Sequence, residues 1–183
     1  LLLFVLPLLL IVVTVVYSLY LRNRPSLAHI SKGVDMLNTG HTREAEQEWR
    51  TALREAPDNP RPYELLATLY LNGGQAQRAI ELLESLQKIA PRTEHLTCKL
   101  AEAYLQTDNQ KKALEIAKQA VILEPNCPNA HAIMGMAHGN VEEVKASISE
   151  LRKAYQLAPS NDKISLSFVQ ALLDGNEPEE AET

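Results

Sequence analysis

The sequence predicts an all-α protein built from a repeated pair of helices. Prolines recur every 34 residues without an insertion, at Pro57, Pro91, Pro125 and Pro159. Each follows a run of residues typical of a helix. Proline ends a helix because it lacks an N–H and clashes with the preceding turn. So strict a period indicates a structural repeat.

Small residues recur at two positions of this repeat and indicate its internal structure. Counted from Ser26, the eighth position holds Gly33, Ala67, Ala101, Gly135 and Val169, and the twentieth holds Ala45, Ala79, Ala113, Ser147 and Ala181. Two antiparallel helices approach closely only where side chains are small, so these positions predict where the helices of each hairpin touch. The eleventh position is mostly bulky, with Met36, Tyr70, Tyr104, His138 and Leu172.

This pattern of small, bulky and proline positions resembles the tetratricopeptide repeat (TPR) family. The resemblance covers Ser26 to about Thr183, although repeat four departs from the pattern at Ser147 and with Gly139 placed early. It implies a TPR solenoid, a right-handed superhelical array of antiparallel helix hairpins. The repeats would span residues 26–59, 60–93, 94–127 and 128–161, followed by a partial fifth repeat or capping helix at 162–183.

Turn residues divide each repeat into two helices. Gly73-Gly74, Asp108-Asn109 and Gly139-Asn140 are typical turn pairs. We therefore expect helices at 27–38 and 42–55, 61–72 and 76–89, 94–106 and 110–123, 129–138 and 142–157, and 162–173. Residues 177–181 resemble the opening of a further helix.

An uncharged segment precedes the repeats. Residues 1–21 read LLLFVLPLLLIVVTVVYSLYL, and as a helix they would cover roughly 30 Å, the thickness of a bilayer's hydrocarbon core. Arg22 and Arg24 follow as a charged stop. The segment predicts a single transmembrane helix, joined to the repeats by a short juxtamembrane linker at 22–25. A cleaved signal peptide is the alternative, but no small-residue cleavage site follows the apolar run.

The charge balance argues against nucleic acid as a partner. Without Arg22 and Arg24, 16 of the 18 basic side chains remain against 23 acidic ones, a balance of about −7. A phosphate-binding surface needs clustered positive charge, and the longest basic run here is Lys111-Lys112.

Motifs for catalysis or cofactor binding are missing, so we predict a protein that is not an enzyme and needs no cofactor. His131 and His138 with Cys127 are candidate metal ligands, but both histidines occupy packing positions of the repeat.

Trp49 is predicted to be buried where one repeat packs on the next. Cys98 lies 29 residues before Cys127 at a different point of the pattern, so no disulfide is predicted.

In the TPR family the first helices of successive repeats line a concave groove. The resemblance, carried over position by position, implies a partner-binding groove centred on repeats two and three. Its predicted residues are Arg61, Glu64, Thr68, Asn72, His95, Cys98, Glu102, Gln106, Asn129, Met136 and Asn140. The same positions of repeat one hold Ile30 and Val34, which cannot grip a terminal carboxylate as some family members do.

A ladder of amides has two interpretations. Asn38, Asn72, Gln106 and Asn140 recur every 34 residues. They would either hydrogen-bond the backbone of an extended peptide or merely end each first helix.

Three functional hypotheses follow. The first is a membrane-anchored scaffold that binds a protein or peptide segment and catalyses nothing. The second is an accessory subunit of an integral membrane complex, held by residues 1–21, and the third is the regulatory N-terminal part of a larger enzyme. Arg22 and Arg24 favour a cytoplasmic position of the repeats, as do two cysteines with no predicted disulfide. The periplasmic or outer side stays open.

Overall fold

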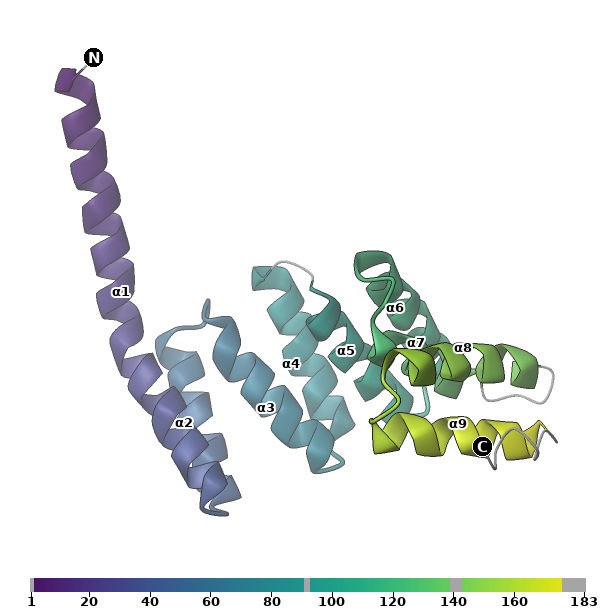
Figure 1. Ribbon diagram of the computed structural model, residues 1–183. Coiled ribbons are helices and arrows are strands. Elements are labelled where there is room, and N and C mark those ends of the chain that lie inside the picture. Colours follow the sequence, from purple (N-terminus) through teal and green to yellow (C-terminus); the bar gives the residue numbers. More distant parts are fainter. Residues whose placement is uncertain (1, 91–92, 139–142, 176–183) are drawn as a thin grey trace. The chain divides into compact units, whose positions relative to one another are not determined.

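The computed structural model describes the backbone of residues 2–90, 93–138 and 143–175, and their side chains except those of residues 2–10, 18–24 and 94. Helices account for the regular structure of these residues (Figure 1). In chain order they are α1 (Leu2–Asn38), α2 (Thr42–Glu55), α3 (Pro60–Asn72), α4 (Ala76–Ile89), α5 (Glu94–Gln106), α6 (Gln110–Leu123), α7 (Pro128–Ala137), α8 (Val144–Leu157) and α9 (Asp162–Asp174).

The predicted all-α hairpin pattern is confirmed. Most predicted boundaries agree with the observed ones to within one residue. The exceptions are α1, which extends far before residue 27, and α8, which begins at Val144 rather than 142. Residues 139–142 and the predicted helix opening at 177–181 lie outside the described residues.

The chain divides into two compact units, residues 1–69 and 70–183, with the division inside α3. In the first unit α1 and α2 form an antiparallel pair, and α1 continues as one uninterrupted helix (Figure 1). The expected linker at 22–25 is therefore helical. Pro25 does not end the helix, because one proline removes a single backbone hydrogen bond while its fixed φ still suits a helix.

The membrane prediction gains no support from the structure. Considering only the residues described, no helix has an apolar stretch long enough to cross a membrane. Of residues 1–21, only 11–17 have described side chains, and these are exposed.

Small side chains set the contacts within the hairpins, as predicted. Gly135 on α7 faces α8, and a Cβ built on it would lie 3.0 Å from the backbone oxygen of Ser147 and 2.6 Å from Cγ of Leu151. Ala45, Ala79 and Ala113 at the twentieth position have no exposed surface. In the fourth hairpin the eighth position therefore lies against the twentieth and twenty-fourth positions of the facing helix.

Trp49 is fully buried, as predicted, but its observed contacts lie within its own hairpin. Its indole Nε1–H donates to the carbonyl oxygen of Ile30 over 3.2 Å, and its ring covers Gly33. Trp49 thus packs α2 on α1, whereas we expected it between successive repeats.

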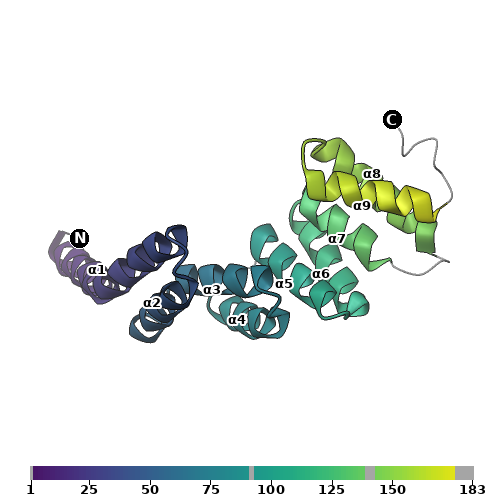
Figure 2. The same cartoon turned by 90° about the horizontal axis from the view of Figure 1, so that it is seen from below.

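The second unit has a separate apolar core on each side of α7. One cluster joins α5, α6 and α7 around Ala101, Ala117 and Ile133. The other joins α7, α8 and α9 around Leu151, Phe168 and Leu172, and Figure 2 shows α9 lying alongside α8. From α5 to α9, neighbouring hairpins therefore bury apolar faces against each other, as stacked repeats do.

The turns of the first three hairpins share one geometry. Gly40, Gly74 and Asp108 have φ values of 82°, 68° and 58°. In each turn the next residue's N–H donates to the carbonyl five residues earlier, over 2.8–2.9 Å. This is the left-handed cap that ends many helices. The repeat period thus extends to the backbone conformation.

The helices that precede the periodic prolines end in one way. Ala56, Ala90, Glu124 and Ala158 each donate the last N–H of the helix to the carbonyl four residues earlier. The next residue is a proline and cannot continue the ladder. In repeats two, four and five the fourth position then donates to that proline's carbonyl, from Tyr63 to Pro57 over 3.0 Å, His131 to Pro125 over 2.9 Å and Ser165 to Pro159 over 3.4 Å.

Candidate functional site

A groove of about 360 Å³ lies along the first helices of repeats three, four and five. Its walls come from α5 and α7, with the start of α9 and the residue before it. The lining residues are His95, Cys98, Lys99, Glu102, Leu105, Gln106, Asn129, Ala132, Ile133, Met136, Asn161, Lys163, Ile164 and Ser167.

Helical spacing brings these side chains together. Cys98, Glu102 and Leu105 follow one another at intervals of four and three residues, which places them on one face of α5. Ala132 and Met136 do the same on α7. Ala132, Ile133 and Ile164 are buried, so the groove has an apolar base. A segment that offers apolar side chains can displace water there.

Charged and amide groups surround that base. Lys163 on α9 donates its Nζ–H to Oε1 of Glu102 on α5 over 2.8 Å, and this ion pair spans the groove lining. Both side chains keep contact with solvent, so the pair adds little to stability. Gln106 and Asn129 are exposed and present amide donors and acceptors. The groove therefore combines an apolar base with hydrogen-bonding edges.

Six predicted residues line this groove: His95, Cys98, Glu102, Gln106, Asn129 and Met136. Asn140 lies outside the described residues. Asn72 is the exposed last residue of α3 and does not line the groove. Asn38 and Gln106 likewise end α1 and α5, but Gln106 also faces the groove.

The remaining predicted residues lie on α3 in the first unit. Nη1 of Arg61 lies 3.3 Å from Oε2 of Glu64, and the Thr68 hydroxyl donates to the carbonyl oxygen of Glu64 over 2.8 Å. The charge of Arg61 is thus partly neutralised within its own helix. A binding role for α3 stays a prediction.

Sequence reasoning missed several groove residues. Lys163 occupies the second position of repeat five, the position of Arg61, His95 and Asn129 in earlier repeats. Extending the family's groove positions to repeat five would have identified Lys163. Lys99, Ile133 and Ser167 share the sixth position, which was not among the positions assigned to the groove. Only the structure reveals that the sixth position also faces the groove.

Histidines considered as metal ligands are engaged in other contacts. His131 is buried. Its Nδ1 lies 2.7 Å from Oε2 of Glu150, and its Nε2 is hydrogen-bonded to the carbonyl oxygen of Pro125. His138 contacts Glu143 over 3.0 Å. Within the described parts of the chain, no group of three His, Cys, Asp or Glu side chains is placed to hold a metal ion.

Tyr104 links α5, one of the helices that line the groove, to α4. Its hydroxyl donates to Oε1 of Glu84 over 2.6 Å, joining α5 to α4. Burial, together with the hydrogen bond and the charge of Glu84, raises the pKa of Tyr104 to about 12. The phenol therefore stays protonated at physiological pH and holds α5 in place as a hydrogen-bond donor.

Comparisons with known structures agree with this arrangement. MamA 41-end from Desulfovibrio magneticus RS-1 superimposes with a TM-score of 0.74 at 19% identity, over 87% of this chain and 90% of that one. YrrB, described as a TPR protein with an unusual peptide-binding site, gives a TM-score of 0.64 at 16% identity, over 84% and 79%. At such identities the likeness shows the fold.

Sequence comparison identifies the family. A tetratricopeptide repeat protein 21 homolog of Caenorhabditis elegans is 26% identical over 137 residues, and the match covers 71% of this chain but only 10% of that protein. The family model for the tetratricopeptide repeat matches residues 37–97 and 74–137, more than half of the chain. Such repeats generally serve as non-catalytic scaffolds for protein–protein interaction. The chain belongs to the tetratricopeptide repeat family.

Proposed function

We propose that this chain is a membrane-anchored scaffold that binds a segment of a partner protein between α5, α7 and α9. The observation that carries the proposal is the groove itself. It combines buried Ile133 and Ile164 with exposed Gln106 and Asn129 and with the Glu102–Lys163 pair. An apolar base with polar edges fits a peptide whose side chains alternate between the two environments.

The size and polarity of the groove favour a peptide over a globular face. A volume of about 360 Å³ holds a few side chains. The amides of Gln106 and Asn129 provide both donors and acceptors for a peptide backbone. YrrB, which shares the fold, is described as having a peptide-binding site, and this supports the same ligand class here.

The anchor in this proposal rests on the sequence. Residues 1–21 carry no charge, and Arg22 and Arg24 follow them, as at the end of a spanning helix. The arginines stand on the side of the repeats, so the proposal places the repeats in the cytoplasm. The anchor predicts that the full chain stays in alkaline-washed membranes and that deleting residues 1–21 releases it. A full chain that the wash already removes would contradict the anchor and leave the groove proposal intact.

Selection of random peptides on the full chain tests groove binding. Asn129→Trp places a large side chain at the groove edge, whereas Lys118→Trp makes the same change on the exposed surface of α6. Selected peptides should lose affinity for N129W by roughly ten-fold or more, because the indole would occupy space that the bound peptide needs. They should bind K118W as they bind the unchanged chain.

Circular dichroism of both variants checks that helix content is retained. Peptides that bind N129W and the unchanged chain equally well would place the binding surface elsewhere and overturn the proposed groove.

A further inference from the structure

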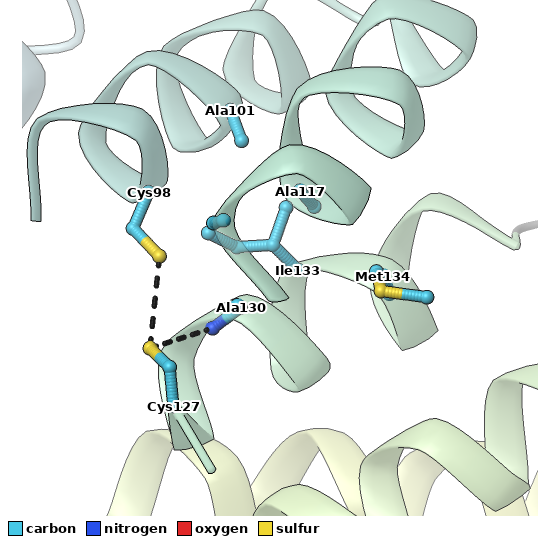
Figure 3. Packing of buried hydrophobic residues seen from close by; sticks show 8 residues of the cluster. Cys98, Ala101, Ala117, Cys127, Ala130, Ile133 and Met134 are labelled. Atoms are coloured by element: carbon cyan, nitrogen blue, oxygen red, sulfur yellow. Dashed lines mark hydrogen bonds between the residues drawn. The ribbon is translucent and has the colours of Figure 1, made fainter. Parts of the chain in front are cut away.

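Two cysteine thiols meet at the boundary between repeats three and four. Sγ of Cys98, on α5, lies 3.7 Å from Sγ of Cys127, the residue that caps the start of α7 (Figure 3). The two residues are 29 positions apart in the sequence, which gave no sign of a disulfide. A disulfide bond is about 2.05 Å long, so the sulfurs need to approach by less than about 2 Å.

The two sulfurs have different surroundings. Cys98 lines the groove, whereas Cys127 does not. Both side chains are about 5% exposed or less, and they belong to one apolar cluster with Ala101 and Ile133. Sγ of Cys127 accepts the backbone N–H of Ala130 over 3.4 Å. This N–H and the start of α7 favour negative charge on that sulfur.

We propose that Cys98 and Cys127 form a peroxide-sensitive dithiol that closes into an intramolecular disulfide. Cys98 lines the groove, so a hydroperoxide can approach its sulfur from there. The sulfur of Cys98 attacks one peroxide oxygen as its thiol loses its proton, the O–O bond breaks, and the departing hydroxide takes up that proton to form water. Cys98 is then a sulfenic acid.

Cys127 completes the reaction. Its thiolate attacks the sulfur of the Cys98 sulfenic acid, the S–O bond breaks, and the hydroxyl leaves with a proton as water. In total two thiols and one hydrogen peroxide give one disulfide and two waters. The peroxide is reduced and the two sulfurs are oxidised.

The disulfide would act on the groove. It joins α5 to α7, the two helices that supply most of the groove lining, and it closes a loop of about 30 residues in the unfolded chain. Oxidation therefore fixes the spacing of these two helices and removes the Cys98 thiol from the groove wall. This inference does not depend on the identity of any partner.

Mass spectrometry of the full chain tests the proposal. The reduced chain is treated with hydrogen peroxide, quenched in acid, unfolded and alkylated. The expected product is a monomer that takes up no alkylating reagent, has lost two hydrogen atoms, and recovers both thiols after dithiothreitol. Its thermal midpoint should rise by roughly 5–10 °C, as expected for a loop of this length.

Two variants serve as controls. Cys98→Ala keeps a small apolar side chain in the cluster, and Cys127→Ser keeps a helix-capping group. Neither should lose two hydrogens or gain thermal stability with peroxide. The proposal is overturned if the unchanged chain keeps both thiols under conditions that oxidise glutathione in the same tube. It is also overturned if peroxide yields only oxygen-bearing cysteines or disulfide-linked dimers.

Discussion

Gly33 and Trp49 form a matched pair across the first hairpin, because a Cβ at Gly33 would lie 2.4 Å from the indole nitrogen. The corresponding pair in repeat three is Ala101 with Ala117, both fully buried. In this hairpin a large residue on the second helix thus goes with glycine on the first, whereas the same positions of repeat two hold Ala67 and Leu83. Gly135 and Leu151 repeat the relationship in repeat four.

This pairing predicts a strong coupling between the two sites. Gly33→Ala should destabilise the chain by about 1–3 kcal/mol, because the indole must move to admit the methyl group. In a Trp49→Ala background the same change should cost little, since the ring is gone. Urea unfolding of the unchanged chain, the two single variants and the double variant measures the coupling between the two sites. Equal costs of Gly33→Ala in both backgrounds would show that the clash does not determine the effect.

Asp108 is the non-glycine residue in a turn position that Gly40 and Gly74 occupy in the preceding repeats. Its φ is 58°, where a side chain is disfavoured. Asp108→Gly should therefore stabilise the chain by up to about 1 kcal/mol. The matched change Gly74→Ala, at φ 68°, should destabilise it by a similar amount. A fall in the urea midpoint of D108G would contradict this reasoning.

Glu48 should make stability depend on pH. The pKa of its carboxyl is held below 4.5, first by the hydrogen bond from Lys32 and then by that from His29, although burial acts in the opposite direction. A lowered folded-state pKa adds stability that is fully present above pH 4.5 and is lost as pH falls through the folded-state pKa. The stability advantage of the unchanged chain over Glu48→Gln should shrink below pH 4.5. An advantage that grows on acidification would refute the assignment.

The bond between His131 and Pro125 should contribute more than its counterpart in the next repeat. His131 is 2% exposed, and its removal takes away a buried ring together with its hydrogen bonds to Glu150 and Pro125. His131→Ala should cost about 1–3 kcal/mol. Ser165→Ala, which removes a longer contact of 3.4 Å, should cost less. Thermal unfolding of the two variants compares them, and a larger loss for S165A would exclude this ranking.

Periodic positions account for what the sequence could predict. Prolines and small residues mark where helices end and touch, so most helix boundaries and the hairpin contacts followed from spacing alone. The proximity of Cys98 and Cys127 did not, because it depends on how α7 starts relative to α5 and not on position within a repeat. The continuity of α1 through Pro25 was missed because residues 22–25 were expected to form a linker between two separate helices.

The groove was predicted in part for the same reason. Residues such as Glu102 and Gln106 occupy positions known to face inward in the family, and they do line the groove. Ile133 and Ser167 occupy a position that spacing does not assign to the groove. Whether these two residues face the groove depends on the angle between neighbouring hairpins, which a repeat pattern leaves undetermined.

Site-specific photo-crosslinking in living cells tests the central claim most directly. A photoreactive phenylalanine analogue placed at position 129, on the groove edge, is compared with one at position 118, on the exposed surface of α6. The account predicts a discrete crosslinked partner polypeptide from position 129 and none from position 118. A partner captured from position 118 but not from position 129 would contradict it, because binding would then occur outside the groove.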